Sequence, residues 1–247
     1  MKLQKSSYFL SIIGLFLLLT QSLFQFSCAR TLDSTPRSTS SNDLFNTAEF
    51  RQLSSIHQYF TRIAFGSEYN SQDTQLKRWE SNIRLKITGS PTTEDQNTVR
   101  TVISELNTLL EETEIRVSIA GESESYTTKI EFIPRENFRN SLPNSNNLAN
   151  GFVTVWYGSN RRIYKSHILI ATDQSETRRQ HVIREEITQS LGLLNDTYDY
   201  NNSIFYQGYS TVSTFSEFDR AIIALAYSDT CDTGMSLENC ITSLSRN

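Results

Sequence analysis

Histidine is scarce in this chain of 247 residues, which contains only His57, His167 and His181. A zinc site with three imidazole ligands would need all of them, and only His181 lies in a segment with the spacing of a metal-binding helix. The sequence also lacks a Gly-x-Ser-x-Gly element, a phosphate-binding glycine loop and a dinucleotide fingerprint, so several common enzyme classes have no support. The net charge of −4 and the isoelectric point near 5.5 give no reason to expect a nucleic acid partner.

Glycine, proline and methionine are also few, whereas tyrosine and phenylalanine are plentiful, with 11 and 14 residues. Hydrophobic residues make up 37% of the chain and charged residues 20%, which is sufficient for a globular core. No repeat at the periods of solenoids or propellers is present. Residues 30–43 are rich in Ser, Thr and Pro and predict a flexible tether. We expect residues 44–247 to form a single domain.

A long apolar run near the N-terminus predicts an export signal over residues 1–29. Lys2 and Lys5 precede the run, which is too short for a membrane-spanning helix. Small residues favour cleavage after Ala29. The alternative is lipidation at Cys28, although Gln25 stands where a lipobox has Leu or a similar residue. In either case we expect an exported protein that is secreted, periplasmic or anchored to a membrane as a lipoprotein.

The chain is organised around residues 177–196, which read T-R-R-Q-H-V-I-R-E-E-I-T-Q-S-L-G-L-L-N-D. Helical spacing places four apolar residues on one side, namely Ile183, Ile187, Leu191 and Leu194. On roughly the opposite side lie His181, Glu185 and Gln189, with Glu186 beside them. Gly192 is expected to end the helix, because glycine readily takes a positive φ. One side of the helix should therefore face the core, while the other presents polar groups to solvent or a cleft.

This polar side has the frame of a zincin metallopeptidase helix, but without the zinc ligands. Zincins have His-Glu-x-x-His, in which two histidines bind the metal and the glutamate is the general base. Here Glu186 and Gly192 are in place, while Glu185, Gln189 and Asn195 occupy the three histidine positions. Their oxygen atoms suit calcium, magnesium or manganese better than zinc. We therefore expect no zinc, although a hard divalent cation is possible.

Two further features near this helix have alternative interpretations. His181 and Glu185 have the i, i+4 spacing of a two-ligand metal pair, but the same spacing occurs on a polar helix face exposed to solvent. Asn195, Asp196 and Asp199 carry oxygen donors after the helix, without the spacing of a calcium loop. The alternative for these residues is an ordinary polar loop.

A family resemblance rests first on the run R-E-E-I-T-Q-S-L-G-L-L-N-D-T-Y-D-Y-N-N-S-I-F. Together with residues 60–69, 78–89 and 218–235, it is similar to a family of bacterial lipoproteins called domain of unknown function 2927. Members of that family have Glu-Glu-x-x-Gln where zincins have His-Glu-x-x-His. The resemblance extends over residues 60–235. It implies a zincin-like fold, supplies no activity, and implies that the absent histidines are a property of the whole family.

The other expected elements follow from periodicity, turn residues and capping boxes. In chain order they are a helix at 44–65, a strand at 83–87, a long helix capped by Thr92 and Asp95, strands at 115–119 and 127–133, a polar loop at 135–150 suited to form a rim, a hairpin of residues 152–157 and 163–171, and a helix at 216–227 capped by Ser216 and Asp219. The apolar run 168–171 suggests a strand covered on both faces. The expected fold class is α+β: a zincin-like, metallopeptidase-like domain with a twisted mixed sheet backed by helices and the Glu-Glu-x-x-Gln helix beneath it.

Two cysteines, Cys231 and Cys240, remain once Cys28 is removed or acylated. In an oxidising compartment such a pair often forms a disulfide, and the alternative is two free thiols.

Three functions are compatible with these features. The first is an exported, envelope-associated binding module without peptidase activity, whose ligand is an unknown extracytoplasmic molecule or protein. The second is a metal-dependent or carboxylate-based hydrolase in which Glu186 is the general base and Glu185, Gln189 and Asp196 hold a hard cation. The third is a scaffold in which the Glu-Glu pair only contacts neighbouring arginines, such as Arg178, Arg179 or Arg184.

Overall fold

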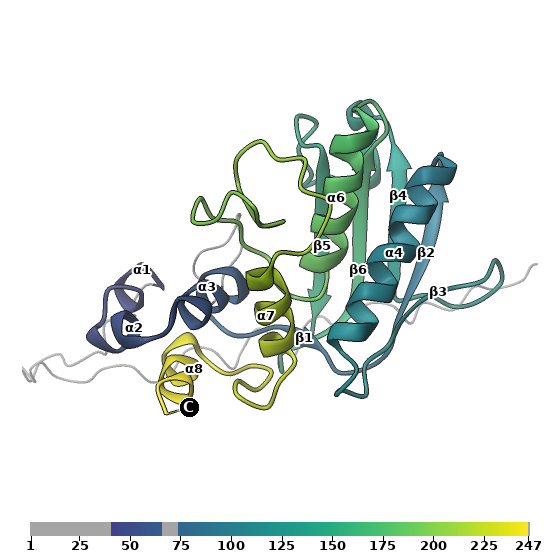
Figure 1. Ribbon diagram of the computed structural model, residues 1–247. Coiled ribbons are helices and arrows are strands. Elements are labelled where there is room, and N and C mark those ends of the chain that lie inside the picture. Colours follow the sequence, from purple (N-terminus) through teal and green to yellow (C-terminus); the bar gives the residue numbers. More distant parts are fainter. Residues whose placement is uncertain (1–40, 66–73, 247) are drawn as a thin grey trace, which may run out of the picture. The chain divides into compact units, whose positions relative to one another are not determined.

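The computed structural model describes residues 41–65 and 74–246 (Figure 1). The predicted export signal with its cleavage and lipidation sites, and residues 30–40 of the predicted tether, lie outside the described residues. Residues 41–43, also assigned to the tether, instead begin a short helix, α1 (Ser41–Leu44). Among the described helices, none is long and apolar enough to cross a membrane.

The single helix predicted over residues 44–65 is wrong, because two further helices follow α1 there: α2 (Ala48–Gln52) and α3 (Ser55–Ala64). The side chains of Thr47 and Ser54 each accept a backbone hydrogen bond and begin a new helix. Between them, Leu53 is extended, with ψ at 150°. The apolar periodicity continues across these breaks, since α2 and α3 bury their apolar sides and Leu44 of α1 packs against the core.

The predicted mixed sheet is present and has six strands, one more than predicted, because the short first strand was missed (Figure 1). They are β1 (Arg78–Trp79), β2 (Ile83–Gly89), β3 (Val117–Ile119), β4 (Thr128–Ile133), β5 (Gly151–Tyr157) and β6 (Arg162–Ala171). Their order is β1-β6-β4-β2-β3, with parallel pairing throughout, and β5 pairs with β6 as the antiparallel strand of the predicted hairpin. Four of the five strand pairs described here are therefore parallel, and only the pair of β5 and β6 is antiparallel.

Two long helices, α4 (Thr93–Leu109) and α6 (Glu176–Gln189), pack against each other and back the sheet (Figure 1). The predicted capping box begins α4, and its Asp95 side chain also accepts a hydrogen bond from Arg179 Nε at 2.6 Å. Both side chains are buried. This ion pair and a second one, between Arg184 and Glu105, fix α6 against α4.

The remaining helices are shorter. They are a 3-10 turn η1 (Arg135–Asn137), α5 (Phe138–Ser141), α7 (Glu217–Ala226) and α8 (Leu237–Leu244). The capping box predicted for α7 is present, and α7 and α8 pack against the N-terminal helices α1–α3. The structure joins Cys231, in the loop after α7, to Cys240 of α8 by a disulfide.

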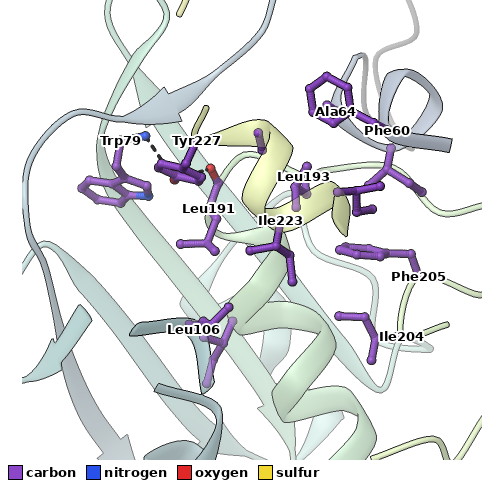
Figure 2. Close-up of a cluster of buried hydrophobic side chains, with 14 of the residues drawn as sticks. Phe60, Ala64, Trp79, Leu106, Leu191, Leu193, Ile204, Phe205, Ile223 and Tyr227 are labelled. Carbon is purple, nitrogen blue, oxygen red and sulfur yellow. Dashed lines mark hydrogen bonds between the residues drawn. The ribbon is translucent and has the colours of Figure 1, made fainter. Parts of the chain in front are cut away.

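The main core lies between the sheet and the helices α4, α6 and α7, and part of it is drawn in Figure 2. Trp79 and Tyr227 lie beside Leu191 at the C-terminal end of α6 (Figure 2). The Trp79 indole donates to the Ser190 carbonyl at 2.8 Å, and the Tyr227 hydroxyl donates to the Leu191 carbonyl at 2.8 Å. These donors satisfy carbonyls that a helix end leaves without partners.

The strand β6 is covered on both faces at residues 168–171, as predicted. Ile168 and Ile170 belong to the main core, whereas Leu169 and Ala171 belong to a second cluster on the other face. Phe138 of α5 joins this second cluster. The segment between β4 and β5, which contains α5, therefore covers β6 on the face of the sheet opposite the main core.

Candidate functional site

A pocket of about 620 Å³ lies along β5 and α6. Its walls come from the β5 edge, the polar side of α6, the loop after α6 and the loop before β5. The lining residues are Lys77, Asn144, Leu148, Ala149, Asn150, Gly151, Phe152, Val153, Thr154, Val155, Tyr157, Arg178, Val182, Glu185, Glu186, Gln189, Leu194, Asp196, Tyr206, Gln207 and Gly208. The second half of the polar loop predicted at 135–150 thus forms a rim, whereas its first half folds into η1 and α5.

One wall of the pocket is an open strand edge. Ala171 N donates to the Asn150 carbonyl at 2.9 Å, which fixes the side on which β5 pairs with β6. Because successive residues of a strand turn their N–H and C=O groups to alternate edges, Gly151, Val153 and Val155 direct theirs away from β6. Among the described residues, no strand pairs with this outer edge of β5. The pocket is therefore bordered by backbone donors and acceptors at regular spacing.

The opposite wall carries the predicted polar residues of α6. Glu185, Glu186 and Gln189 are only 9%, 6% and 7% exposed, and all three line the pocket. They face a cleft, so the alternative of a solvated helix face is wrong for them. A Cβ built on Gly151 would lie 2.7 Å from Glu186 Cγ and closer still to Val182 Cγ1 and Glu186 Oε1. Glycine at position 151 thus permits β5 to approach α6 at Glu186.

His181 does not line the pocket, contrary to its assignment as a cleft residue. It is fully buried beneath the loop that follows α6, with Nδ1 2.6 Å from the Val212 carbonyl, so Nδ1–H is the donor in this contact. Its Nε2 lies 3.4 Å from Glu185 Oε2. The predicted i, i+4 contact between the two residues is therefore present, but the histidine sits behind the carboxylate instead of in the cleft.

The residues after α6 divide between structural contacts and the pocket. The Asn195 side-chain amide donates to the carbonyls of Arg62 and Phe65, at 3.0 and 2.7 Å, and does not line the pocket, so its assignment to the cleft is wrong. Asp196 does line the pocket and accepts a hydrogen bond from Gln189 Nε2 at 2.7 Å. Leu194, expected in the core stripe, is half-buried and lines the pocket instead. The cause is Gly192, whose φ of +109° turns the chain before Leu194.

The arginines near the Glu-Glu pair mostly point elsewhere. Arg179 and Arg184 pair with Asp95 and Glu105 of α4, so they do not serve the scaffold role proposed for them. Arg178 lines the pocket, where its guanidinium lies 5.4 Å from the centre of the Tyr209 ring and donates to the Ser210 carbonyl.

Three of the candidate ligands for a hard cation, Glu185, Gln189 and Asp196, line the same pocket. Among residues 41–65 and 74–246, no three His, Cys, Asp or Glu side chains form a group that could hold a metal ion. Gln189 directs its amide nitrogen to Asp196, so these two side chains already contact each other.

Several lining residues were missed by reasoning from the sequence. Lys77 precedes β1, and its Nζ lies 5.4 Å from the centre of the Tyr157 ring. Tyr157 lies in a segment that was predicted only as a strand, and Tyr206 lies in a segment that was predicted only as a polar loop. Gly151 is a sequence signal for this site, because a glycine within a strand often marks a place where another group approaches the backbone closely.

The fold and the pocket define an α/β domain with a polar cleft between an open strand edge and two buried glutamates of a helix. The chain belongs to the family described as Protein of unknown function (DUF2927), whose model matches residues 54–246. No curated protein matches the chain. Two solved structures of myroilysin are similar at 13% and 11% identity, with TM-scores of 0.36 and 0.39. They cover 62% and 73% of this chain, and 95% and 96% of their own chains. TM-scores this low do not by themselves establish a common fold.

Proposed function

We propose that the protein is an exported, zincin-like domain that binds an extended polypeptide segment in this pocket and does not hydrolyse it. The observation that carries the proposal is the open edge of β5, where Gly151, Val153 and Val155 direct backbone N–H and C=O groups along the pocket. An extended segment can add to such an edge as a further strand, and main-chain hydrogen bonds then supply affinity for many sequences.

The space beside β5 supports this mode of binding. The pocket of about 620 Å³ lies between the strand edge and α6, so a bound segment would place alternate side chains toward the helix. Small-molecule sites are mostly apolar, whereas this wall presents Glu185, Glu186 and Gln189. A polar polypeptide is therefore a better match to the site than an apolar small molecule.

The absence of hydrolysis is proposed from the residues at the zincin histidine positions. Asn195 is held by the Arg62 and Phe65 carbonyls, and Gln189 donates to Asp196. These contacts support structural roles for both side chains. The alternative, a hydrolase with Glu186 as the general base, stays a prediction, because Glu186 lines the same pocket.

Export is proposed from the sequence of residues 1–29 and is supported by the disulfide between Cys231 and Cys240, a bond typical of oxidising compartments. The mass of the mature N-terminus distinguishes cleavage after Ala29 from lipidation at Cys28, because the two products differ in both residues and attached lipid. The partner is then an extracytoplasmic polypeptide.

Peptide retention tests the proposal. The purified protein is immobilised, exposed to random nonapeptides with blocked termini, and the retained peptides are identified by mass spectrometry. Val153→Pro removes one outward N–H at an edge where proline is tolerated, and Val153→Ala is the matched control that only trims the side chain. We expect the wild type and Val153→Ala to retain peptides and Val153→Pro to lose them. Equal retention by Val153→Pro overturns strand addition, and peptide cleavage that vanishes in Glu186→Gln overturns the non-hydrolytic function.

A further inference from the structure

We propose that Glu185 makes the pocket selective for polypeptide segments that carry a lysine or arginine side chain. This inference rests on the proposed function and adds the chemical class of the segment. It assigns recognition to the first glutamate of the pair, which occupies a zincin histidine position, and not to Glu186.

Glu185 is a buried acceptor directed into the pocket. It is 9% exposed and lines the pocket, and no described residue donates a hydrogen bond to its carboxylate. Its Oε2 lies 3.4 Å from Nε2 of His181, a residue that does not line the pocket. A mostly buried carboxylate that receives no hydrogen bond from the protein gains stability from a ligand that supplies donors. A basic side chain that enters the pocket would supply both the donors and the opposite charge.

The positive side chains of the pocket are directed to other groups. Lys77 Nζ donates to the Gln75 carbonyl at 3.1 Å and lies over the Tyr157 ring. Arg178 donates to the Ser210 carbonyl and lies over the Tyr209 ring. No described cation contacts the Glu185 carboxylate apart from the His181 ring, which is charged only when protonated.

The register of the strand edge brings a bound segment close to this carboxylate. Glu186, next to Glu185 on α6, packs against Gly151, one of the residues with outward backbone groups. A segment added at Gly151 and Val153 would therefore run past the same turn of α6. Lysine and arginine have long flexible stems, and their charged ends can reach a carboxylate at the base of a pocket while the backbone stays at the edge.

The rim favours a polypeptide over a small cation. Leu148 and Tyr209 are 83% and 80% exposed, and both border the pocket, since Leu148 lines it and Tyr209 covers Arg178. Tyr198 is 68% exposed and contacts Tyr206, another lining residue. Exposed apolar and tyrosine side chains around a polar centre are typical of surfaces that bind proteins. They would cover the residues on either side of the basic one.

A double-mutant cycle tests this assignment. From the nonapeptides retained by the wild type, one labelled peptide with an internal lysine and its Lys→Gln partner are measured by fluorescence anisotropy. Both are measured against the wild type, Glu185→Gln, and the control Glu176→Gln, which makes the same charge change at an exposed position of α6 outside the pocket. Urea unfolding of each variant checks that it is folded.

We expect lysine and arginine to be enriched among the retained peptides. The Lys→Gln change should then weaken binding to the wild type about tenfold or more, the range for a charge-assisted hydrogen bond. Glu185→Gln should weaken the lysine peptide similarly and make it equal to the glutamine peptide, whereas Glu176→Gln should keep the discrimination. No enrichment, or an equal Lys→Gln loss in Glu185→Gln, overturns the selectivity while strand addition stands. A column that retains no peptide at all overturns the proposed function and this inference together.

Discussion

Replacing Gly151 by alanine tests the close approach between β5 and α6 on which the pocket depends. The added Cβ would lie 2.7 Å from Glu186 Cγ and closer to Val182 Cγ1, so at least one neighbour must move. Val182 is 1% exposed and cannot turn into solvent, whereas the end of the Glu186 side chain can shift within the pocket. Position 151 does not have a positive φ, so the cost comes from packing and not from backbone strain. Overpacking of this kind costs about 1–3 kcal/mol of unfolding free energy.

The assay is urea unfolding followed by tryptophan fluorescence, which comes from Trp79 in the core and Trp156 on β5. Val182→Ala alone should also destabilise the protein, because it removes buried methyl groups. In Gly151→Ala with Val182→Ala, the space left by Val182 accommodates the new Cβ. The double variant should therefore be more stable than the sum of the two losses by about 0.5–3 kcal/mol. A neutral Gly151→Ala, or strictly additive losses, would show that β5 and α6 are not in this contact.

Three further predictions concern the parts that support the site. Tyr227→Phe leaves the Leu191 carbonyl without its donor and should lower the unfolding free energy by about 1–3 kcal/mol in urea titrations; an unchanged midpoint would contradict this bond. The pKa of His167 is lowered, chiefly by burial and then by a nearby lysine, so the stability it confers is present above about pH 6.5 and is lost as the pH falls through the lowered value. Unfolding at pH 7.5 and 5 should therefore show a smaller acid-induced loss for His167→Gln than for the wild type, and equal losses would refute the assignment. Replacing Cys231 and Cys240 by serine should lower stability by roughly 2–4 kcal/mol and remove the sensitivity of the wild type to dithiothreitol; a wild type insensitive to the reductant would count against the bond.

Elements specified by neighbouring residues could be predicted from the sequence. Both capping boxes form with the predicted partners, since the side chain and the amide it caps are three residues apart. The hairpin of β5 and β6 is also local, and Arg161 takes the positive φ of 64° in its turn. The break before α3 was missed because Ser54 begins a helix without interrupting the apolar spacing.

The candidate site was only partly predictable, because its surroundings come from distant parts of the chain. The spacing of α6 correctly brought Glu185, Glu186 and Gln189 to one side. It could not show that His181 is covered by a loop whose Val212 carbonyl accepts its proton, 31 residues further along. Nor could it show that Asn195 is held by α3, more than 100 residues earlier. Long-range contacts of this kind decide which polar residues face a pocket.

The burial of the Glu-Glu pair is the strongest physical reason to place function at this helix. Carboxylates removed from water are among the most unfavourable groups in a protein interior, and most glutamates lie at the surface. Here Glu185 is 9% exposed and receives no hydrogen bond from a described residue, while Arg179 and Arg184 of the same helix pair with the carboxylates of α4. A fold selected for stability alone would direct an arginine to Glu185 or replace this glutamate by an apolar residue. A destabilising buried carboxylate is expected at a functional site, where a bound ligand supplies its missing partner. The pocket beside the β5 edge is where that ligand would bind.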